Sequence, residues 1–170
     1  MKRWLTGLAL VSSFSVAQAA ELKVNDPAPN FTLKTHEGKD FELKSRAGQW
    51  TVLYFYPKDD TPGCTKQACA FRDNIKKIRA QSAEVYGISA DTVEKHASFH
   101  KSQRLNFALL ADPEAKIIEQ YGAKMPAANM SNRWTFIVNP ELKIAAIDKD
   151  VDPVVDSEKI ADQIAALKKK

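Results

Sequence analysis

Cys64 and Cys69 are the residues of this sequence best suited to covalent chemistry, and Cys64 has the more informative surroundings. It follows Thr61, a preferred helix N-cap residue, and Pro62, which fits the first position of a helix. A helix that begins there places Cys64 in its first turn. Unpaired N–H groups and the positive end of the helix dipole favour a thiolate at that place. The sequence therefore predicts a nucleophilic cysteine.

The residues that follow Cys64 place it on the buried side of that helix. Apolar residues recur with helical spacing at Ala68, Phe71, Ile75 and Ile78, in line with Cys64. The preceding segment, 50–56, is continuously apolar and typical of a strand buried on both faces. We expect Cys64 at the bottom of a pocket at the carboxyl edge of the strands, where open α/β sheets carry their sites.

Cys69 lies too far along the helix for a simple disulfide with Cys64. Five helical residues separate two Cα atoms by about 8.6 Å, whereas a disulfide needs about 7 Å or less. The pair is thus expected to have two states, a helical dithiol and a locally unwound disulfide. A constitutive disulfide remains the alternative, and a metal site is less favoured because further ligands are not evident.

Strand and helix patterns alternate along the rest of the chain, which predicts an α/β fold with a mostly parallel central sheet flanked by helices. The last helix is expected to have Ser157 as its cap. We find no repeat and no linker, so one domain is expected. The expected strands are 31–33, 40–43, 50–56, 84–89, 107–110, 133–138 and 142–148, and the expected helices are 62–80, 92–104, 114–121 and 157–167.

Composition and charge exclude several classes of protein. The chain has 170 residues, of which 44% are hydrophobic and 27% charged, as in ordinary globular proteins and unlike disordered ones. The formal charge of +4 is spread along the sequence, with one basic block at 168–170, so nucleic-acid binding has no support.

The first nineteen residues are typical of a secretory signal peptide. Lys2 and Arg3 precede an uncharged apolar run, 4–16, and Ala17 and Ala19 occupy the positions of a cleavage site. We expect cleavage after Ala19, a mature domain of residues 20–170 and a periplasmic or otherwise exported protein. No cysteine follows the run, so a membrane anchor is not expected; the alternative is a buried N-terminal helix.

The segment around Cys64 resembles the peroxiredoxin family. PKDDTPGCT matches its Pro-x-x-x-Thr-x-x-Cys signature, and YFYPKDDTPGCTKQAC followed by FRDNI is similar to the peroxiredoxin Q group, also called bacterioferritin comigratory proteins. The similarity extends from DPAPNF through ISAD and LLAD to RWTFIV.

This resemblance implies a thioredoxin-like fold and a thiol peroxidase that acts on hydrogen peroxide and organic hydroperoxides. Cys64 would be the peroxidatic cysteine, forming a sulfenic acid, and Cys69 the resolving cysteine, forming an intramolecular disulfide that a thioredoxin-like protein reduces. No cofactor or metal is implied, and a monomer is expected. The alternative is a thioredoxin-fold partner in thiol-disulfide exchange without peroxidase activity.

The resemblance also implies roles for four residues around the thiol. Thr61 would bind the peroxide, Pro57 and Pro62 would shape and shield the pocket, and Arg133 would hold the thiolate. From its position alone, Arg133 is equally compatible with a surface arginine on an edge strand. Trp134 stands where the family usually has a small Ser or Thr. Neighbours in a strand point to opposite faces, so Trp134 need not enter the pocket; the alternative is that it alters the neighbouring surface that large substrates or a reductant would use.

Other polar residues carry weaker signals. His96 and His100 are four residues apart on an expected helix, and a solvated helix face is favoured over a metal site. His36 lies in an expected turn without an evident partner. Asp59 and Asp60 precede the central helix, where they are expected to favour its positive end rather than act as catalytic carboxylates.

Overall fold

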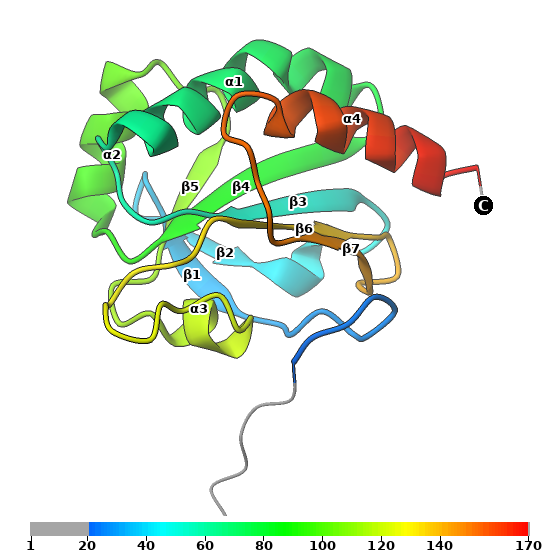
Figure 1. The fold of residues 1–170 in the computed structure, drawn as a ribbon, viewed down its shortest axis with the longest axis horizontal. Helices are drawn as coiled ribbons and strands as arrows, with labels where there is room; N and C mark the ends of the chain where they lie inside the picture. Colours follow the sequence, from blue (N-terminus) through cyan, green and yellow to red (C-terminus); the bar gives the residue numbers. More distant parts are fainter. Residues whose placement is uncertain (1–20, 170) are drawn as a thin grey trace, which may run out of the picture.

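The computed structural model describes residues 21–169, and the predicted signal peptide, 1–19, lies outside them. Within residues 21–169, none of the helices has the length and apolar character needed to cross a membrane. These residues form a seven-stranded sheet with helices on both faces (Figure 1). The predicted α/β class is therefore confirmed.

The strands lie in the order β2-β1-β5-β4-β3-β6-β7. Their bounds are β1 Thr32–Thr35, β2 Asp40–Glu42, β3 Trp50–Phe55, β4 Ala83–Ser89, β5 Ala108–Ala111, β6 Trp134–Val138 and β7 Ile144–Asp148. Only β3–β4 and β4–β5 pair in parallel, and the other four neighbouring pairs are antiparallel. The prediction of a mostly parallel sheet is thus wrong, because helical crossovers join only the three central strands.

The helices divide between the two faces of the sheet. Their bounds are η1 Leu43–Arg46, α1 Pro62–Arg79, α2 Val93–Ser102, α3 Lys116–Gln120 and α4 Asp156–Leu167. In Figure 1, α1, α2 and α4 lie above the sheet, with α4 alongside α1, and α3 lies below it.

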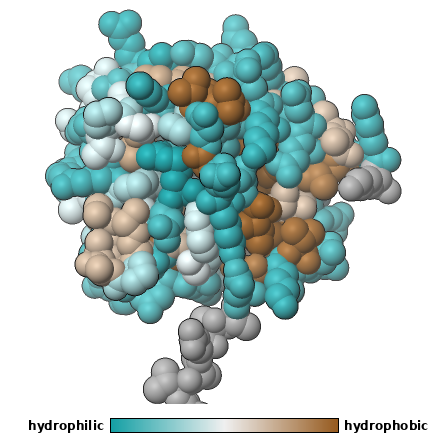
Figure 2. Space-filling view, viewed as in Figure 1, coloured by the Kyte–Doolittle hydropathy of each residue, from teal (hydrophilic) through white to brown (hydrophobic). Residues whose placement is uncertain are grey.

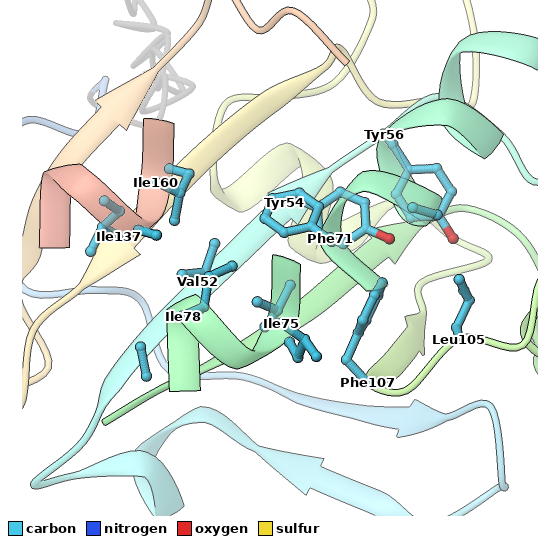
Figure 3. Close-up of a cluster of buried hydrophobic side chains, with 14 of the residues drawn as sticks. Val52, Tyr54, Tyr56, Phe71, Ile75, Ile78, Leu105, Phe107, Ile137 and Ile160 are labelled. Atoms are coloured by element: carbon cyan, nitrogen blue, oxygen red, sulfur yellow. The ribbon is translucent and has the colours of Figure 1, made fainter. Parts of the chain in front are cut away.

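One hydrophobic core fills the space between the sheet and the layer of α1, α2 and α4. The predicted helical stripe from Cys64 to Ile78 is buried in it, as expected from the spacing. Figure 3 shows Tyr54 and Tyr56 of the β3 region beside Phe71 of α1. The rings of Tyr54 and Phe71 are stacked with centroids 4.8 Å apart. A second core lies on the opposite face of the sheet, between the sheet and α3.

The pairing of β3 with β6 brings two distant segments to the same sheet edge. The strands are antiparallel, with Phe55 opposite Trp134. The loop after β3 therefore meets the residue before β6, which is Arg133. This register places the residues that precede α1 next to Arg133.

Of the two predicted helix caps, Thr61 is confirmed in its position and Ser157 is not. Thr61 occupies the N-cap position of α1, but its hydroxyl donates to the Lys58 carbonyl oxygen, at 3.0 Å, instead of capping the helix. Ser157 lies inside the first turn of α4, which begins at Asp156, and its hydroxyl accepts a hydrogen bond from Asn74 of α1. The prediction of Ser157 as the cap is wrong because this buried contact to α1 takes up its side chain.

The surface in the view of Figure 2 is mostly hydrophilic, with hydrophobic residues in separate groups. Among residues 21–169, the large apolar side chains that are exposed are Val24, Val154 and Val155. Val154 and Val155 belong to the connection that leads from β7 to α4.

Candidate active site

The thiol of Cys64 is enclosed at the start of α1. Its side chain is 1% exposed and belongs to the core between the sheet and α1. The first backbone hydrogen bond of the helix runs from Thr65 N–H to the Thr61 carbonyl oxygen, at 2.9 Å. The N–H groups of Gly63 and Cys64 precede this bond, so they belong to the helix end that favours negative charge.

Arg133 is the charged group that contacts this thiol. Its Nη2 lies 3.4 Å from Cys64 Sγ, and its Nη1 donates to Gln67 Oε1 at 2.5 Å. Gln67 is one turn after Cys64 on α1 and is fully buried. The guanidinium is therefore held at two points, one of which is the sulfur. Arg133 is thus a site residue by geometry and not a surface arginine on an edge strand.

Gly63 leaves the space that the guanidinium occupies. A Cβ atom added at Gly63 would lie 3.1 Å from Arg133 Nη2, closer than ordinary van der Waals contact. The glycine next to the cysteine thus allows the helix end and the guanidinium to approach closely.

Gln67 connects Arg133 to a buried carboxylate on the last helix. Gln67 Nε2 donates to Asp156 Oδ2 at 2.7 Å, and Thr135 Oγ1 donates to the same oxygen at 3.1 Å. Burial raises the pKa of Asp156 to about 6. A chain of contacts therefore runs from Cys64 through Arg133 and Gln67 to Asp156.

The loop between β3 and α1 is anchored by a second buried network. Asp59 Oδ1 accepts from the Tyr56 hydroxyl at 2.7 Å, and Asp59 Oδ2 lies 2.8 Å from His96 Nδ1. The backbone N–H of Asp59 donates to Asp91 Oδ2 at 2.9 Å. The loop that carries Thr61 is therefore fixed to β3, α2 and the end of β4.

This network corrects two expectations about polar residues. His96 is fully buried, so the prediction of a solvated helix face is wrong for it. Its Nδ1 lies 2.8 Å from Asp59 Oδ2 and its Nε2 lies 3.2 Å from the Leu110 carbonyl oxygen, so both ring nitrogens have a polar partner in the core. Asp59 holds the loop from inside, whereas Asp60 remains exposed.

His100 and His36 lie away from the thiol and contact each other. Their rings are stacked with centroids 3.8 Å apart. His36 is thereby joined to α2, a partner that the sequence did not indicate. Among residues 21–169, no group of three or more His, Cys, Asp or Glu side chains is arranged to hold a metal ion.

Cys69 points to a different side of α1 from Cys64. Its Sγ lies 3.7 Å from Gln103 Oε1, beyond the end of α2, and both cysteines are free thiols. The helix is continuous from Pro62 to Arg79, so the structure corresponds to the helical dithiol state.

A cleft of about 270 Å³ opens beside the loop. Its lining includes Pro57 and Lys58 of this loop together with Asn129 and Met130. Cys64 does not line this cleft, because its side chain is enclosed by the core and by Arg133. The expected pocket therefore does not open directly onto the thiol in this state.

Comparisons with known proteins agree with this arrangement. The family model described as the AhpC/TSA family matches residues 24–147. A putative peroxiredoxin bcp of Coxiella burnetii is 40% identical over 132 residues, which are 74% of this chain and 87% of that protein. The chain belongs to the AhpC/TSA family, in its peroxiredoxin Q group.

Two further relatives support the assignment. Chloroplastic peroxiredoxin Q of Populus jackii is 44% identical over 139 residues, which are 79% of this chain and 64% of that protein. The chain thus spans somewhat less than two thirds of this plant relative. The crystal structure of peroxidoxin BcpB from Mycobacterium tuberculosis superposes with a TM-score of 0.80 at 30% identity, covering 86% of this chain and 98% of that one. The fold of this peroxiredoxin is accordingly thioredoxin-like.

Trp134 is the position at which this peroxiredoxin departs from the family pattern. Its partly buried ring packs against the core on the opposite face from Cys64, and Lys149 Nζ lies 4.4 Å from the ring centroid. Arg133 and Trp134 therefore point to opposite faces, as neighbours at the start of a strand do. The Trp134 ring therefore lies away from Cys64, on the other side of the sheet.

Proposed function

We propose that this protein is a thiol peroxidase that reduces hydrogen peroxide and organic hydroperoxides to water and alcohols. The observation that carries the proposal is the Arg133 guanidinium 3.4 Å from the buried Cys64 sulfur. A hydroperoxide has no charge by which it can be held. The rate must therefore come from a stabilised thiolate and from donors directed at the charge that develops on oxygen.

In the first step, the Cys64 thiolate attacks the terminal oxygen of the hydroperoxide. The O–O bond breaks, Cys64 becomes a sulfenic acid, and the leaving oxygen takes up a proton to give water or an alcohol. Arg133 faces the reacting sulfur, so it serves both the thiolate and the departing oxygen. The Thr61 hydroxyl donates its own hydrogen to Lys58, which leaves its lone pairs to accept from the peroxide O–H.

In the second step, the Cys69 thiol attacks the sulfenic sulfur, so that a disulfide forms and water leaves. The helical spacing of the two cysteines requires α1 to unwind between them before they can bond. A dithiol protein of the thioredoxin type then reduces the disulfide and returns both thiols. Pro57 shapes the loop that ends at Thr61 and lines the neighbouring cleft.

The deciding experiment follows hydroperoxide consumption by the reduced protein with a dithiol reductant. Cys64→Ser should abolish consumption, and Cys69→Ser should permit one turnover and accumulate sulfenic acid at Cys64. Mass spectrometry of the oxidised wild type should find a Cys64–Cys69 disulfide. Reduction of protein disulfides without any reaction with peroxide would instead indicate a thiol-disulfide exchange partner.

We propose export to the periplasm on the basis of the N-terminal sequence pattern of residues 1–19. The mature protein isolated from native cells should begin at Ala20. Recovery of the intact N-terminus, or of the protein in the cytosolic fraction, would contradict this.

We also propose that the protein acts as a monomer, because both cysteines of the cycle lie on one helix of one chain. Light scattering of the reduced and the oxidised protein should give the mass of one chain in both states.

A further inference from the structure

Asp156 is the first residue of α4, a place where acids are common, but its side chain is buried, which is unusual for an acid. Its side chain is 1% exposed, and it lies on the side of α4 that packs against α1. Oδ2 accepts from Gln67 and from Thr135, while Oδ1 is buried without a hydrogen-bond partner among residues 21–169. A carboxylate that is buried and only half satisfied opposes folding. Its presence therefore calls for a reason other than stability.

The position of Asp156 supplies that reason, because the carboxylate determines how Gln67 is turned. An ionised carboxylate can only accept hydrogen bonds, so the amide of Gln67 must present its NH2 group to Asp156. The amide oxygen then faces the other way, toward Arg133 Nη1 at 2.5 Å. Asp156 thus orients the group that holds the guanidinium against Cys64.

The same hydrogen bond crosses the segment that must change during the cycle. Gln67 lies between Cys64 and Cys69, and it must leave its place when α1 unwinds for disulfide formation. Figure 1 shows α4 lying alongside α1, reached by the connection that rises from β7 past α1. The contact from Gln67 to Asp156 therefore ties the reactive turn of α1 to an element that does not need to move.

We propose that Asp156 is a positioning residue that acts through Gln67, holding Arg133 against Cys64 and keeping the turn from Cys64 to Cys69 helical. The inference rests on the proposed peroxidase function. It assigns opposite effects to one carboxylate. Asp156 assists the attack on peroxide and slows the resolution that follows.

The surroundings of Asp156 identify the charges that influence it. Burial is the main cause of its raised pKa, the hydrogen bonds from Gln67 and Thr135 oppose it, and the carboxylate of Asp148 on β7 adds to it. Lys159 on α4 lowers the pKa of Asp156 but is itself paired with Asp148. From β3, the buried hydroxyl of Tyr54 faces the same region.

The test compares Asp156→Asn and Asp156→Ala with Glu158→Gln. The control removes an acid two residues further along α4 that pairs with Lys77 of α1, at 3.1 Å, and that makes no hydrogen bond to Gln67 within residues 21–169. In a Cys69→Ser background, sulfenic acid formation at Cys64 should slow by about five- to tenfold for Asp156→Ala and less for Asp156→Asn, as expected for one weakened hydrogen bond. With Cys69 present, the disulfide should form about three- to tenfold faster once Cys64 is oxidised. Glu158→Gln should leave both rates unchanged.

Two readouts separate positioning from a general loss of structure. In the reduced protein, amide exchange over residues 62–70 should increase in both Asp156 variants, while the protection of β3 and β4 stays the same. The rate of sulfenic acid formation in Asp156→Asn relative to wild type should approach one below about pH 6, where Asp156 takes up a proton.

The outcomes distinguish this inference from the proposed function. If the wild type does not react with hydroperoxide, the proposed function fails. Amide hydrogen exchange in the reduced protein still tests whether Asp156 keeps the turn from Cys64 to Cys69 helical. If Asp156→Ala does not fold, Asp156→Asn carries the comparison because it keeps the shape of the side chain. Rates and exchange in Asp156→Asn that match wild type and Glu158→Gln at all pH values would overturn the inference.

Discussion

Cys64 keeps its sulfur inside the core, where a thiolate has little water around it, and Arg133 brings a positive charge into contact with the sulfur. This pairing explains why the thiol can be both protected and reactive. The N–H groups at the start of α1 add to the same effect. A second hydrogen bond, from Arg133 Nη1 to Gln67 Oε1, holds the guanidinium in place.

Arg133→Met should remove this charge while retaining most of the apolar length of the side chain. We expect the rate of hydroperoxide reduction to fall roughly 10- to 100-fold, because a hydrogen bond to a charged group is worth about 1.5–3 kcal/mol and tenfold corresponds to about 1.4 kcal/mol. Thermal unfolding should change little. Stopped-flow measurement of peroxide consumption tests this, with Arg79→Met, at the far end of α1, as the control. Equal loss of activity in both variants would contradict the role of Arg133.

Gly63→Ala should separate activity from stability. Alanine is the better helix residue by about 0.5–1 kcal/mol, so the melting temperature should stay the same or rise. The added Cβ, 3.1 Å from Arg133 Nη2, should displace the guanidinium and slow peroxide reduction several-fold. Calorimetry and peroxide kinetics on the same sample check both effects. Unchanged kinetics would show that the guanidinium adapts at no cost.

Individual residues differ in how much the sequence discloses about them. Cys64 and its helix stripe were predictable because helix caps and apolar spacing are local signals. Asp156 and His96 were not, because each is buried by partners about 40 to 90 residues away in the sequence. A buried acid or histidine looks the same in a sequence as an exposed one. Gly63 was visible beside Cys64, but its purpose depends on Arg133, which approaches from another strand.

At the scale of elements, α1 has two tasks that conflict. It must be helical to place Cys64 next to Arg133, and it must unwind for Cys69 to reach the oxidised sulfur. Phe71 is buried on the same stripe as Cys64 and stacks on Tyr54. Unwinding as far as Phe71 therefore removes an aromatic ring from the core.

The oxidised protein should consequently be less stable than the reduced protein, the reverse of the usual effect of a disulfide. The reason is the apolar surface that unwinding exposes. Thermal unfolding of both forms, with amide exchange across residues 62–75, measures this. Cys69→Ser treated with peroxide is the control and should keep the helix. Equal melting temperatures and equal protection in the two redox states would favour a static disulfide.

The elements also show which parts of the fold the sequence could specify. Strand and helix positions follow from local periodicity, and most of the expected bounds lie within about two residues of the observed ones. Strand direction does not follow in this way, because the antiparallel contact of β3 with β6 depends on a connection of many residues. That contact brings Arg133 to Cys64, so the site depends on the part of the topology that was hardest to predict.

At the scale of the whole molecule, two cores lie on opposite faces of one sheet, and the site belongs to only one of them. Cys64 is part of the core between the sheet and α1, whereas the partly buried Trp134 packs against the core between the sheet and α3. Substitutions under α3 should therefore affect stability more than chemistry. The stacked rings of His36 and His100 join the loop after β1 to α2, two segments that are distant in the sequence.

This histidine pair should make global stability sensitive to acid. Burial, and then the charge of His100, lower the pKa of His36, and burial lowers the pKa of His100 below its usual 6.5. The unfolded chain therefore takes up protons at a higher pH than the folded one. The contribution of the pair is complete above about pH 6.5 and is lost as the pH falls through the lower folded values.

His100→Gln tests this contribution. As the pH falls from 7.5 to 5.5, the stability of the variant relative to wild type should increase. The folded wild type resists protonation of His100 in that range, and the variant has one less group to protonate. Asp156 acts in the opposite direction, since its pKa is raised to about 6 and proton uptake stabilises the folded state. The comparison therefore uses the free energy of unfolding, measured with urea for both proteins at each pH. The contribution of Asp156 is the same in the two proteins, so it cancels in the difference between them. A difference in free energy of unfolding that stays the same at every pH would show that protonation of the two rings does not destabilise the folded protein.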